Sequence, residues 1–237
     1  MIEIKTGMAL AAGLGTRMRP LTNDRPKALV ELAGKTLLDY ALDRMAAAGV
    51  QRSVVNIHHF ADKMEAHLAG RTGMPEIIIS DERDTVLETG GGVVKALPLL
   101  GEDPVFITNI DAVWMDGAER EMDRMRAFWD GEKMDVLLLL APMDQTLGFD
   151  GAGDFFLDEE GRIEWRGERA SAPFAYAGTQ IHNPRIMQGR PEEAFSMTKV
   201  WRELVPKGRV YGLAMETFWM HVGDPQAREA AEARLAS

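Results

Sequence analysis

The sequence contains no cysteine among its 237 residues. This absence excludes disulfide bridges, thiolate metal ligands and cysteine nucleophiles. Disulfides are rare in reducing compartments, so a chain without cysteine is compatible with the cytoplasm, where we expect this protein to act.

Positive charge and long apolar runs are also scarce. Lys and Arg number 27 against 37 for Asp and Glu, which gives a net charge of −10, and the basic residues form no block. Nonspecific binding to nucleic acid or to an anionic membrane is therefore not expected. No stretch approaches the roughly 18 uninterrupted apolar residues of a membrane span, and the N-terminal apolar run is too short for a secretion signal.

In about its first 141 residues the chain alternates short apolar runs with amphipathic stretches. This alternation predicts an α/β, Rossmann-like fold in which helices cover both faces of a mixed, mostly parallel sheet. The expected buried strands are Met8 to Ala12, Ser53 to Ile57, Ile77 to Ile79, Val105 to Ile107 and Val136 to Ala141. The expected helices are Thr36 to Ala48, Ala61 to Leu68 and Gly117 to Phe128.

The regular alternation ends near Pro142. The later elements are expected to be a hairpin over Asp154 to Trp165, strands at Tyr176 to Ile181, Val210 to Met215 and Phe218 to Val222, and helices at Thr198 to Leu204 and from Pro225. The chain length suits one domain with an elaboration better than two domains. We therefore expect a single domain over residues 1–237, with halves of about 1–141 and about 142–237 that share one sheet.

The most informative segment follows the first expected strand and reads LAAGLGTRMRPLT over residues 10–22. Gly13 and Gly15 let the backbone approach a ligand, and consecutive amides in such a turn bind an anion. Arg17 and Lys27 add charges that can neutralise a triphosphate from different sides. The spacing matches neither the dinucleotide fingerprint nor the P-loop, and the two glycines alone would fit a plain turn. Together with the two cations, they favour a phosphate site.

A second glycine cluster, Gly90 to Gly92, lies in the run LETGGGVVKALPLL over residues 87–100. The glycines stand just before an apolar helical run, so their amides are expected at a helix N-terminus that is open to a flat ligand such as a base. Three adjacent glycines cost conformational entropy on folding, and a plain flexible helix entry explains that cost less well.

Asp111 is a candidate metal ligand. It follows the expected strand Val105 to Ile107, at the end of the sheet where ligands of open α/β folds bind, and its carboxylate suits Mg²⁺. A helix or turn cap is the alternative role. Four of the five histidines form no metal cluster and are expected as polar surface or loop residues: His58, His59, His67 and His182.

The run over residues 10–22, together with PKALV over residues 26–30, resembles the signature of the sugar-1-phosphate nucleotidyltransferases. The resemblance implies the nucleotide-diphospho-sugar transferase type of fold, Mg²⁺ as cofactor, and an enzyme that joins an NTP to a sugar 1-phosphate and releases pyrophosphate. It implies that Arg17 assists pyrophosphate departure, that Lys27 contacts the phosphates and that Asp111 binds the metal. The residues implied to bind the nucleotide are Leu10, Ala11, Ala12, Gly13, Gly15, Thr16, Glu88 and Gly91.

The second half, which the resemblance implies to be the sugar-binding half, matches the family less closely. Gly153, Glu164 and Gly178 resemble positions from which family members hold the sugar, although Glu168 competes with Glu164 for the alignment.

The metal site departs from the family pattern at two positions. Ile110 stands where glycine is usual, and His221 stands where the family often has a second metal-binding Asp. Either His221 or Asp224 would complete the site, and Asp224, directly before Pro225, also fits a helix N-cap.

The form ETGGG followed by KALPLLG is especially similar to the bacterial N-acetylmuramate 1-phosphate uridylyltransferases of cell-wall recycling, which implies UTP and N-acetylmuramate 1-phosphate as substrates. A mannose-1-phosphate guanylyltransferase is the alternative within the family. A nucleotide-binding regulatory module without turnover is the alternative of another class, and Ile110 and His221 favour it. The expected assembly is a monomer or a small homo-oligomer.

Overall fold

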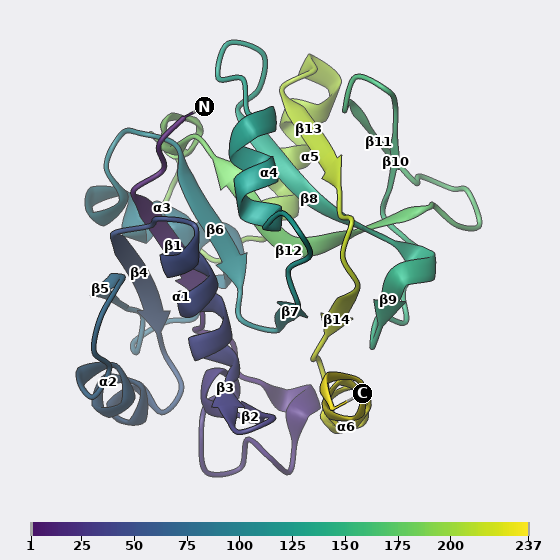
Figure 1. Cartoon of the computed structure of the whole chain (residues 1–237). Coiled ribbons are helices and arrows are strands. Elements are labelled where there is room, and N and C mark those ends of the chain that lie inside the picture. The colour runs from purple at the N-terminus through teal and green to yellow at the C-terminus, as the bar shows by residue number, and fades with distance from the viewer. Residues whose placement is uncertain (1, 237) are drawn as a thin grey trace.

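A nine-stranded sheet runs through the centre of the computed structural model, which describes residues 2–236 (Figure 1). Its strands are β1 (Thr6–Leu10), β4 (Arg52–Ile57), β5 (Glu76–Asp81), β6 (Val105–Asn109), β8 (Val136–Pro142), β10 (Phe155–Leu157), β11 (Ile163–Trp165), β12 (Phe174–His182) and β13 (Val210–Ala214). They follow the order β11-β10-β12-β6-β1-β4-β5, and β8 lies between β12 and β13.

Most neighbouring strands from the first half of the chain are parallel. Strand β1 pairs in parallel with β4 and β6, and β4 does so with β5. Strand β12 is antiparallel to both β6 and β8, and it thereby joins the later strands to the earlier ones in one sheet. The predicted mixed, mostly parallel sheet is confirmed.

Helices cover both faces of this sheet, as predicted. The helices are α1 (Leu37–Ala47), α2 (Ala61–Ala69), α3 (Glu88–Leu100), α4 (Glu121–Phe128), α5 (Met197–Leu204) and α6 (Pro225–Leu235). Short 3₁₀ turns are η1 (Thr16–Met18), η2 (Lys27–Leu29), η3 (Met143–Gln145), η4 (Pro184–Met187) and η5 (Val205–Lys207). Apolar side chains of α1, α2 and α4 pack on one face, and those of α3 and α5 pack on the other.

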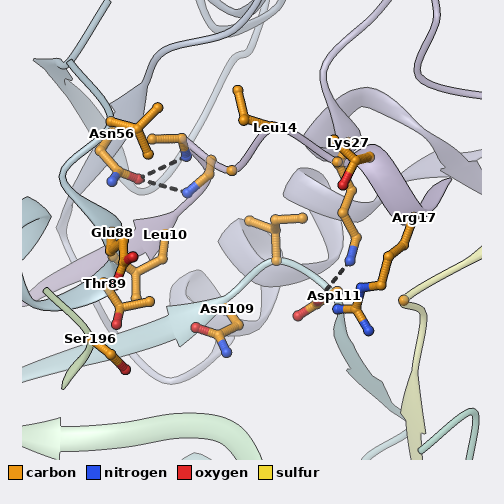
Figure 2. A pocket seen from close by; sticks show the side chains of 18 residues that line it. Leu10, Leu14, Arg17, Lys27, Asn56, Glu88, Thr89, Asn109, Asp111 and Ser196 are labelled. Atoms are coloured by element: carbon orange, nitrogen blue, oxygen red, sulfur yellow. Dashed lines mark hydrogen bonds and ion pairs between the residues drawn. The ribbon is translucent and has the colours of Figure 1, made fainter. Parts of the chain in front are cut away.

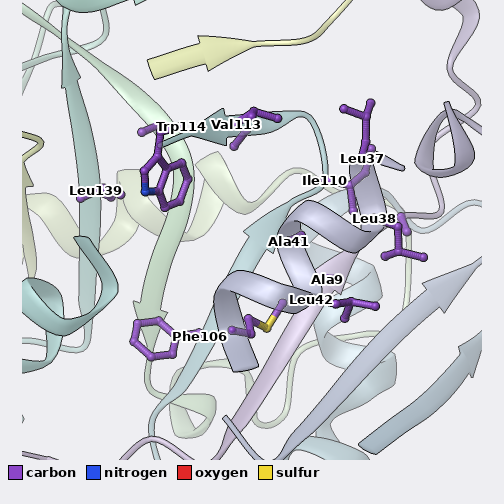
Figure 3. Close-up of a cluster of buried hydrophobic side chains, with 14 of the residues drawn as sticks. Ala9, Leu37, Leu38, Ala41, Leu42, Phe106, Ile110, Val113, Trp114 and Leu139 are labelled. Atoms are coloured by element: carbon purple, nitrogen blue, oxygen red, sulfur yellow. The ribbon is translucent and has the colours of Figure 1, made fainter. Parts of the chain in front are cut away.

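Helix α1 shows how the apolar pattern produces this packing. Its residues Leu37, Leu38, Ala41 and Leu42 are fully or almost fully buried and pack in the same core as Phe106 of β6 (Figure 3). The helix begins where the side chain of its N-cap, Thr36, accepts a hydrogen bond from a backbone amide of the first turn.

Most predicted boundaries are within two residues of the observed ones, and the differences at β1 and α4 affect the surroundings of the cavity and of the helix start. Strand β1 ends at Leu10, so Ala11 and Ala12 lie in the loop that follows. Helix α4 begins at Glu121 and not at Gly117: Arg120 has an extended backbone, and the Asp116 carboxylate accepts the amide of Glu121 at the helix start.

A small sheet joins a strand near the end of the chain to the segment that follows β6. It contains β7 (Ala112–Trp114), β9 (Thr146–Leu147) and β14 (Trp219–His221), and β14 lies between the other two. His221 is therefore directly opposite Ala112, one residue after Asp111. A separate hairpin is formed by β2 (Glu31–Leu32) and β3 (Lys35–Thr36). Within residues 2–236, no helix combines the length and apolar character needed to span a membrane.

The expectation that His182 is a surface or loop residue is wrong. The residue is fully buried at the end of β12, because this strand lies between β6 and β8. Neither ring nitrogen bonds to another described residue. Burial lowers the pKa of His182 from 6.5 to about 3, against the opposing charge of Asp135, so the ring is neutral in the folded protein at ordinary pH.

We expect His182→Leu to make the stability of the protein less sensitive to acid. Between pH 6.5 and about 3 the unfolded chain binds a proton at His182 and the folded chain does not, so the free energy of unfolding falls as the pH falls. The slope is about 1.4 kcal/mol per pH unit for one such group. Urea unfolding of both proteins from pH 7 to pH 4 measures this slope, and parallel curves would contradict the expectation.

Candidate active site

A cavity of about 500 Å³ opens at the carboxyl ends of β1, β4 and β6 (Figure 2). Every residue predicted to bind nucleotide lines it except Gly91, and so do Arg17, Lys27 and Asp111. Leu10, Asn56 and Asn109, from the ends of the three parallel strands, all line the cavity, because parallel strands end on the same edge of a sheet. The predicted nucleotide site and the predicted catalytic side chains therefore share one cavity.

The loop after β1 owes its shape to Gly15. This residue has a φ of +62°, which side chains disfavour, and its carbonyl accepts a hydrogen bond from the Thr22 hydroxyl at 2.9 Å. A Cβ on Gly15 would lie 2.9 Å from the Cβ of Lys27, so the glycine also lets Lys27 approach the loop. A Cβ on Gly13 would meet nothing within 4 Å.

Asn56, at the end of β4, supports the same loop, and sequence reasoning missed it. Its side-chain oxygen accepts the amides of Ala11 at 2.6 Å and Ala12 at 3.3 Å. These two amides are therefore engaged within the protein. The available signal was a polar residue near the end of a buried strand.

Positive charge is concentrated at one end of the cavity (Figure 2). The Lys27 ammonium contacts Asp111 Oδ2 at 2.6 Å, and the two side chains are only 12% and 18% exposed. Arg17 forms no hydrogen bond or ion pair with any residue in the described range 2–236. A guanidinium in a cavity without a protein partner suits an anionic ligand such as a phosphate.

Asp111 and His221 meet at this end of the cavity. The His221 Nδ1–H donates to the Gly148 carbonyl at 3.0 Å, which directs Nε2 toward Asp111 Oδ2, 3.4 Å away. Burial alone would raise the pKa of the Asp111 carboxyl, but the Lys27 ammonium and His221 hold that pKa well below its ordinary value. Asp111 is therefore an anion at neutral pH.

The donor atoms here fit a metal that also binds the substrate. Within residues 2–236, no group of three or more His, Asp or Glu side chains could hold a metal ion. Asp111 offers a carboxylate and His221 an imidazole nitrogen from one small region. A divalent cation could take its remaining ligands from phosphates and water, which is how Mg²⁺ commonly binds nucleotides.

Asp224 caps helix α6. Its Oδ1 accepts the amide of Ala227 at 2.8 Å, and Pro225 occupies the first turn of the helix. Of the two residues considered as partners for Asp111, His221 is the one that contacts it.

Asp224→Ala is expected to lower the free energy of unfolding by about 1 kcal/mol, the usual cost of losing an N-cap. Because asparagine caps helices about as well, Asp224→Asn should keep this stability and also keep the wild-type dependence of activity on divalent cations. Chemical unfolding and a Mg²⁺ titration measure the two effects. A weakened Mg²⁺ dependence in Asp224→Asn would show that the residue is a ligand.

The Gly90 to Gly92 cluster lies inside α3, which begins at Glu88, so the expectation that it precedes the helix is wrong. The Gly90 amide donates to the Phe195 carbonyl at 2.8 Å. A Cβ on Gly91 would lie 2.0 Å from the Glu193 carbonyl oxygen. These two glycines thus permit a segment of the second half to pass against α3, while Glu88 and Thr89 line the cavity.

The same segment adds Ser196 to the cavity wall, another residue that sequence reasoning missed. The Met197 amide donates to the Thr89 hydroxyl at 2.8 Å and holds Ser196 beside α3. The two interacting residues are 108 positions apart, so no local pattern could have revealed the contact.

The three predicted sugar-binding residues do not line this cavity. Gly178 packs beside the cavity wall, since a Cβ there would lie 3.3 Å from the Cβ of Asn109, which lines the cavity. Gly153 has a φ of +80° and packs against the backbone of Ala172. Glu164, on β11, is 69% exposed and pairs with Arg169 at 2.6 Å.

Comparisons with known proteins agree with this arrangement. The model of the MobA-like NTP transferase domain matches residues 7–138. The chain is 54% identical to the N-acetylmuramate alpha-1-phosphate uridylyltransferase of Caulobacter vibrioides, over 98% of this chain and 97% of the relative. It is 33% identical to the enzyme of the same name from Neisseria meningitidis, over 91% and 92%.

A solved structure of UDP-glucose pyrophosphorylase in complex with UDP-glucose has the same fold. Its TM-score with this chain is 0.80 at 17% identity, and the match covers 99% of each chain. The predicted fold class is confirmed by this likeness, and the family by the two sequence relatives. The chain therefore belongs to the MobA-like NTP transferase family and is a sugar-1-phosphate nucleotidyltransferase.

Proposed function

We propose that this enzyme transfers the uridylyl group of UTP to N-acetylmuramate α-1-phosphate and releases pyrophosphate. The main support for this class of reaction is the cavity. In it, an anion-binding loop lies beside an unpaired Arg17 and the Lys27–Asp111 pair. The Caulobacter vibrioides relative supports the choice of base and sugar, because it carries this activity in its name and is 54% identical over nearly the whole chain.

The reaction is a direct displacement at phosphorus. A phosphate oxygen of the sugar 1-phosphate attacks the α-phosphorus of UTP, and a new P–O bond forms. The bond from the α-phosphorus to the bridging oxygen breaks, and its electron pair leaves with pyrophosphate. Such a transfer needs positioning and charge stabilisation more than covalent participation by the protein.

The charged side chains divide this work. Arg17, which has no protein partner, neutralises charge on the departing pyrophosphate, and Lys27 orients the phosphates at the reacting centre. Asp111 would hold Mg²⁺ with help from His221, and the bound ion would neutralise charge on the phosphate oxygens. Imidazole is a poor ligand for Mg²⁺, so His221 would contact the ion through a bound water.

The other end of the cavity would hold the base. Leu10, Glu88, Thr89 and Ser196 line it there, away from the cationic end (Figure 2). Gly153, Glu164 and Gly178 remain our proposed sugar-binding residues, in the half of about 142–237. The proposed location is the cytoplasm, and the proposed assembly is a monomer or a small homo-oligomer.

A panel of pyrophosphate-release assays tests this function. Each NTP is combined with N-acetylmuramate, N-acetylglucosamine, glucose and mannose 1-phosphates. The highest kcat/KM is expected for UTP with N-acetylmuramate 1-phosphate. A preference for GTP with mannose 1-phosphate would establish the guanylyltransferase alternative. Nucleotide binding without pyrophosphate release in any combination would favour a regulatory module.

A further inference from the structure

Glu82, in the turn after β5, is a carboxyl group with no exposure to solvent. Its Oε1 accepts a hydrogen bond from the Asn56 side-chain nitrogen at 2.7 Å, and its Oε2 bonds to no other described residue. Burial raises the pKa of Glu82, while the hydrogen bond from Asn56 and the nearby Leu87 amide act to lower it. A buried carboxyl is costly to maintain, so its contacts indicate a role.

Asn56 links Glu82 to the loop after β1, which forms one wall of the nucleotide cavity. The Asn56 oxygen accepts the amides of Ala11 and Ala12, and the Asn56 nitrogen donates to Glu82. Both polar ends of Asn56 are therefore engaged inside the protein, although the residue lines the cavity. Its orientation is set by Glu82, because only a donor can face that carboxylate oxygen.

Glu82 also contacts helix α3, whose start forms the opposite wall of the cavity. A Cβ on Gly92 would lie 2.9 Å from Glu82 Oε1 and 3.0 Å from the Asn56 nitrogen, so the helix packs directly on this pair. The Leu87 amide near the carboxyl belongs to the N-cap residue of α3, which precedes the cavity residue Glu88. One buried side chain thus touches both sides of the cavity.

We propose that Glu82 and Asn56 are positioning residues for the nucleotide, which set the distance between the loop after β1 and the start of α3. The inference rests on the proposed function, because it takes the cavity to bind UTP. The pair engages the amides of Ala11 and Ala12, so the ligand meets the loop amides from Gly13 onward. Neither residue is placed at the reacting phosphates, so their effect is on nucleotide affinity and base selection more than on the chemical step.

Asn56→Ala and Glu82→Ala test this proposal. Each is expected to raise the Kd of UTP, measured by calorimetry, about tenfold or more, since each leaves buried polar groups unpaired at the cavity wall. The kcat at saturating UTP and the KM of the sugar 1-phosphate should change far less. The preference for UTP over CTP should fall, because the base would no longer be held at a fixed distance from the loop.

The two substitutions should not act independently. Both substitutions break the same Asn56–Glu82 hydrogen bond. The Kd of the double variant for UTP should therefore be about that of the single variant that binds UTP more weakly. Glu82→Gln keeps an oxygen acceptor for Asn56 and should restore a Kd within about threefold of wild type. Multiplicative losses in the double variant would contradict the shared connection.

Gln180→Ala is a matched control. Gln180 is a buried polar residue of β12 that accepts a hydrogen bond from Trp201 at 3.2 Å, and it does not line the cavity. Its loss should lower the melting temperature and leave the Kd of UTP unchanged. Variants at Glu82 and Asn56 that behave in the same way would be merely structural, and the proposal would be overturned.

Two further measurements keep the outcome clear. If Asn56→Ala does not fold, Asn56→Ser serves instead, because its short side chain cannot span both partners. The wild-type protein is titrated with UTP and with GTP first. Weak wild-type binding of UTP would count against the proposed function, and the variants would then be compared on the nucleotide that binds best.

Discussion

Asp111→Asn should lower kcat by about a hundredfold to a thousandfold at every Mg²⁺ concentration, as expected when a preorganised charge at a reacting centre is removed. The substitution keeps the shape of the side chain and removes the anion that pairs with Lys27 and faces His221. Asparagine offers a neutral oxygen, which is a weaker ligand for a hard cation.

Initial rates over a Mg²⁺ titration measure this effect. The matched control is Asp224→Asn, the same chemical change at a helix cap, which should keep wild-type rates. A binding experiment with UTP separates loss of affinity from loss of turnover. Full activity of Asp111→Asn across the titration would show that the metal-site assignment is wrong.

Arg17→Ala and Lys27→Ala should each lower kcat about a hundredfold or more, because each removes a cation placed near the phosphates. They should differ in stability. Arg17 has no partner among the described residues, so its loss should leave the melting temperature unchanged. Lys27→Ala removes the ion-pair partner of the largely buried Asp111 and should lower the melting temperature.

Rates at saturating UTP and thermal unfolding, measured on both variants, test this pair of expectations. The 12% exposure of Lys27 and its 2.6 Å contact with Asp111 are the reasons to expect the loss of stability. Wild-type rates in both variants would overturn the assignment of the phosphate end of the cavity.

Acid unfolding adds an independent check on Asp111. Its pKa is lowered in the folded protein, so the ionised form contributes stability at neutral pH that is lost as the pH falls through the folded pKa. Asp111→Asn lacks this contribution. The free energy of unfolding of the variant should therefore depend less on pH below about 4, near the ordinary pKa of Asp.

The secondary structure and the family could be predicted because their signals are local. The six apolar residues Val136 to Ala141 identify β8 because both faces of this strand are covered and all six residues are buried. The helical spacing of Leu37, Leu38, Ala41 and Leu42 identifies α1 in the same way. The phosphate loop is one contiguous run, so its glycines and Arg17 are visible without knowledge of the fold.

The order and kind of the elements, the loop after β1 and the class of reaction could therefore be predicted without the fold. The tertiary structure alone decided that Asn56 engages the amides of Ala11 and Ala12, that His221 meets Asp111, and that the glycines of α3 admit the segment before Ser196. These contacts join residues that are far apart along the chain, so no local pattern predicts them. The Asn56–Ala11 and Thr89–Met197 contacts join residues 45 and 108 positions apart, and such pairs meet only because β1, β4, β6 and α3 place their ends at one edge of the sheet.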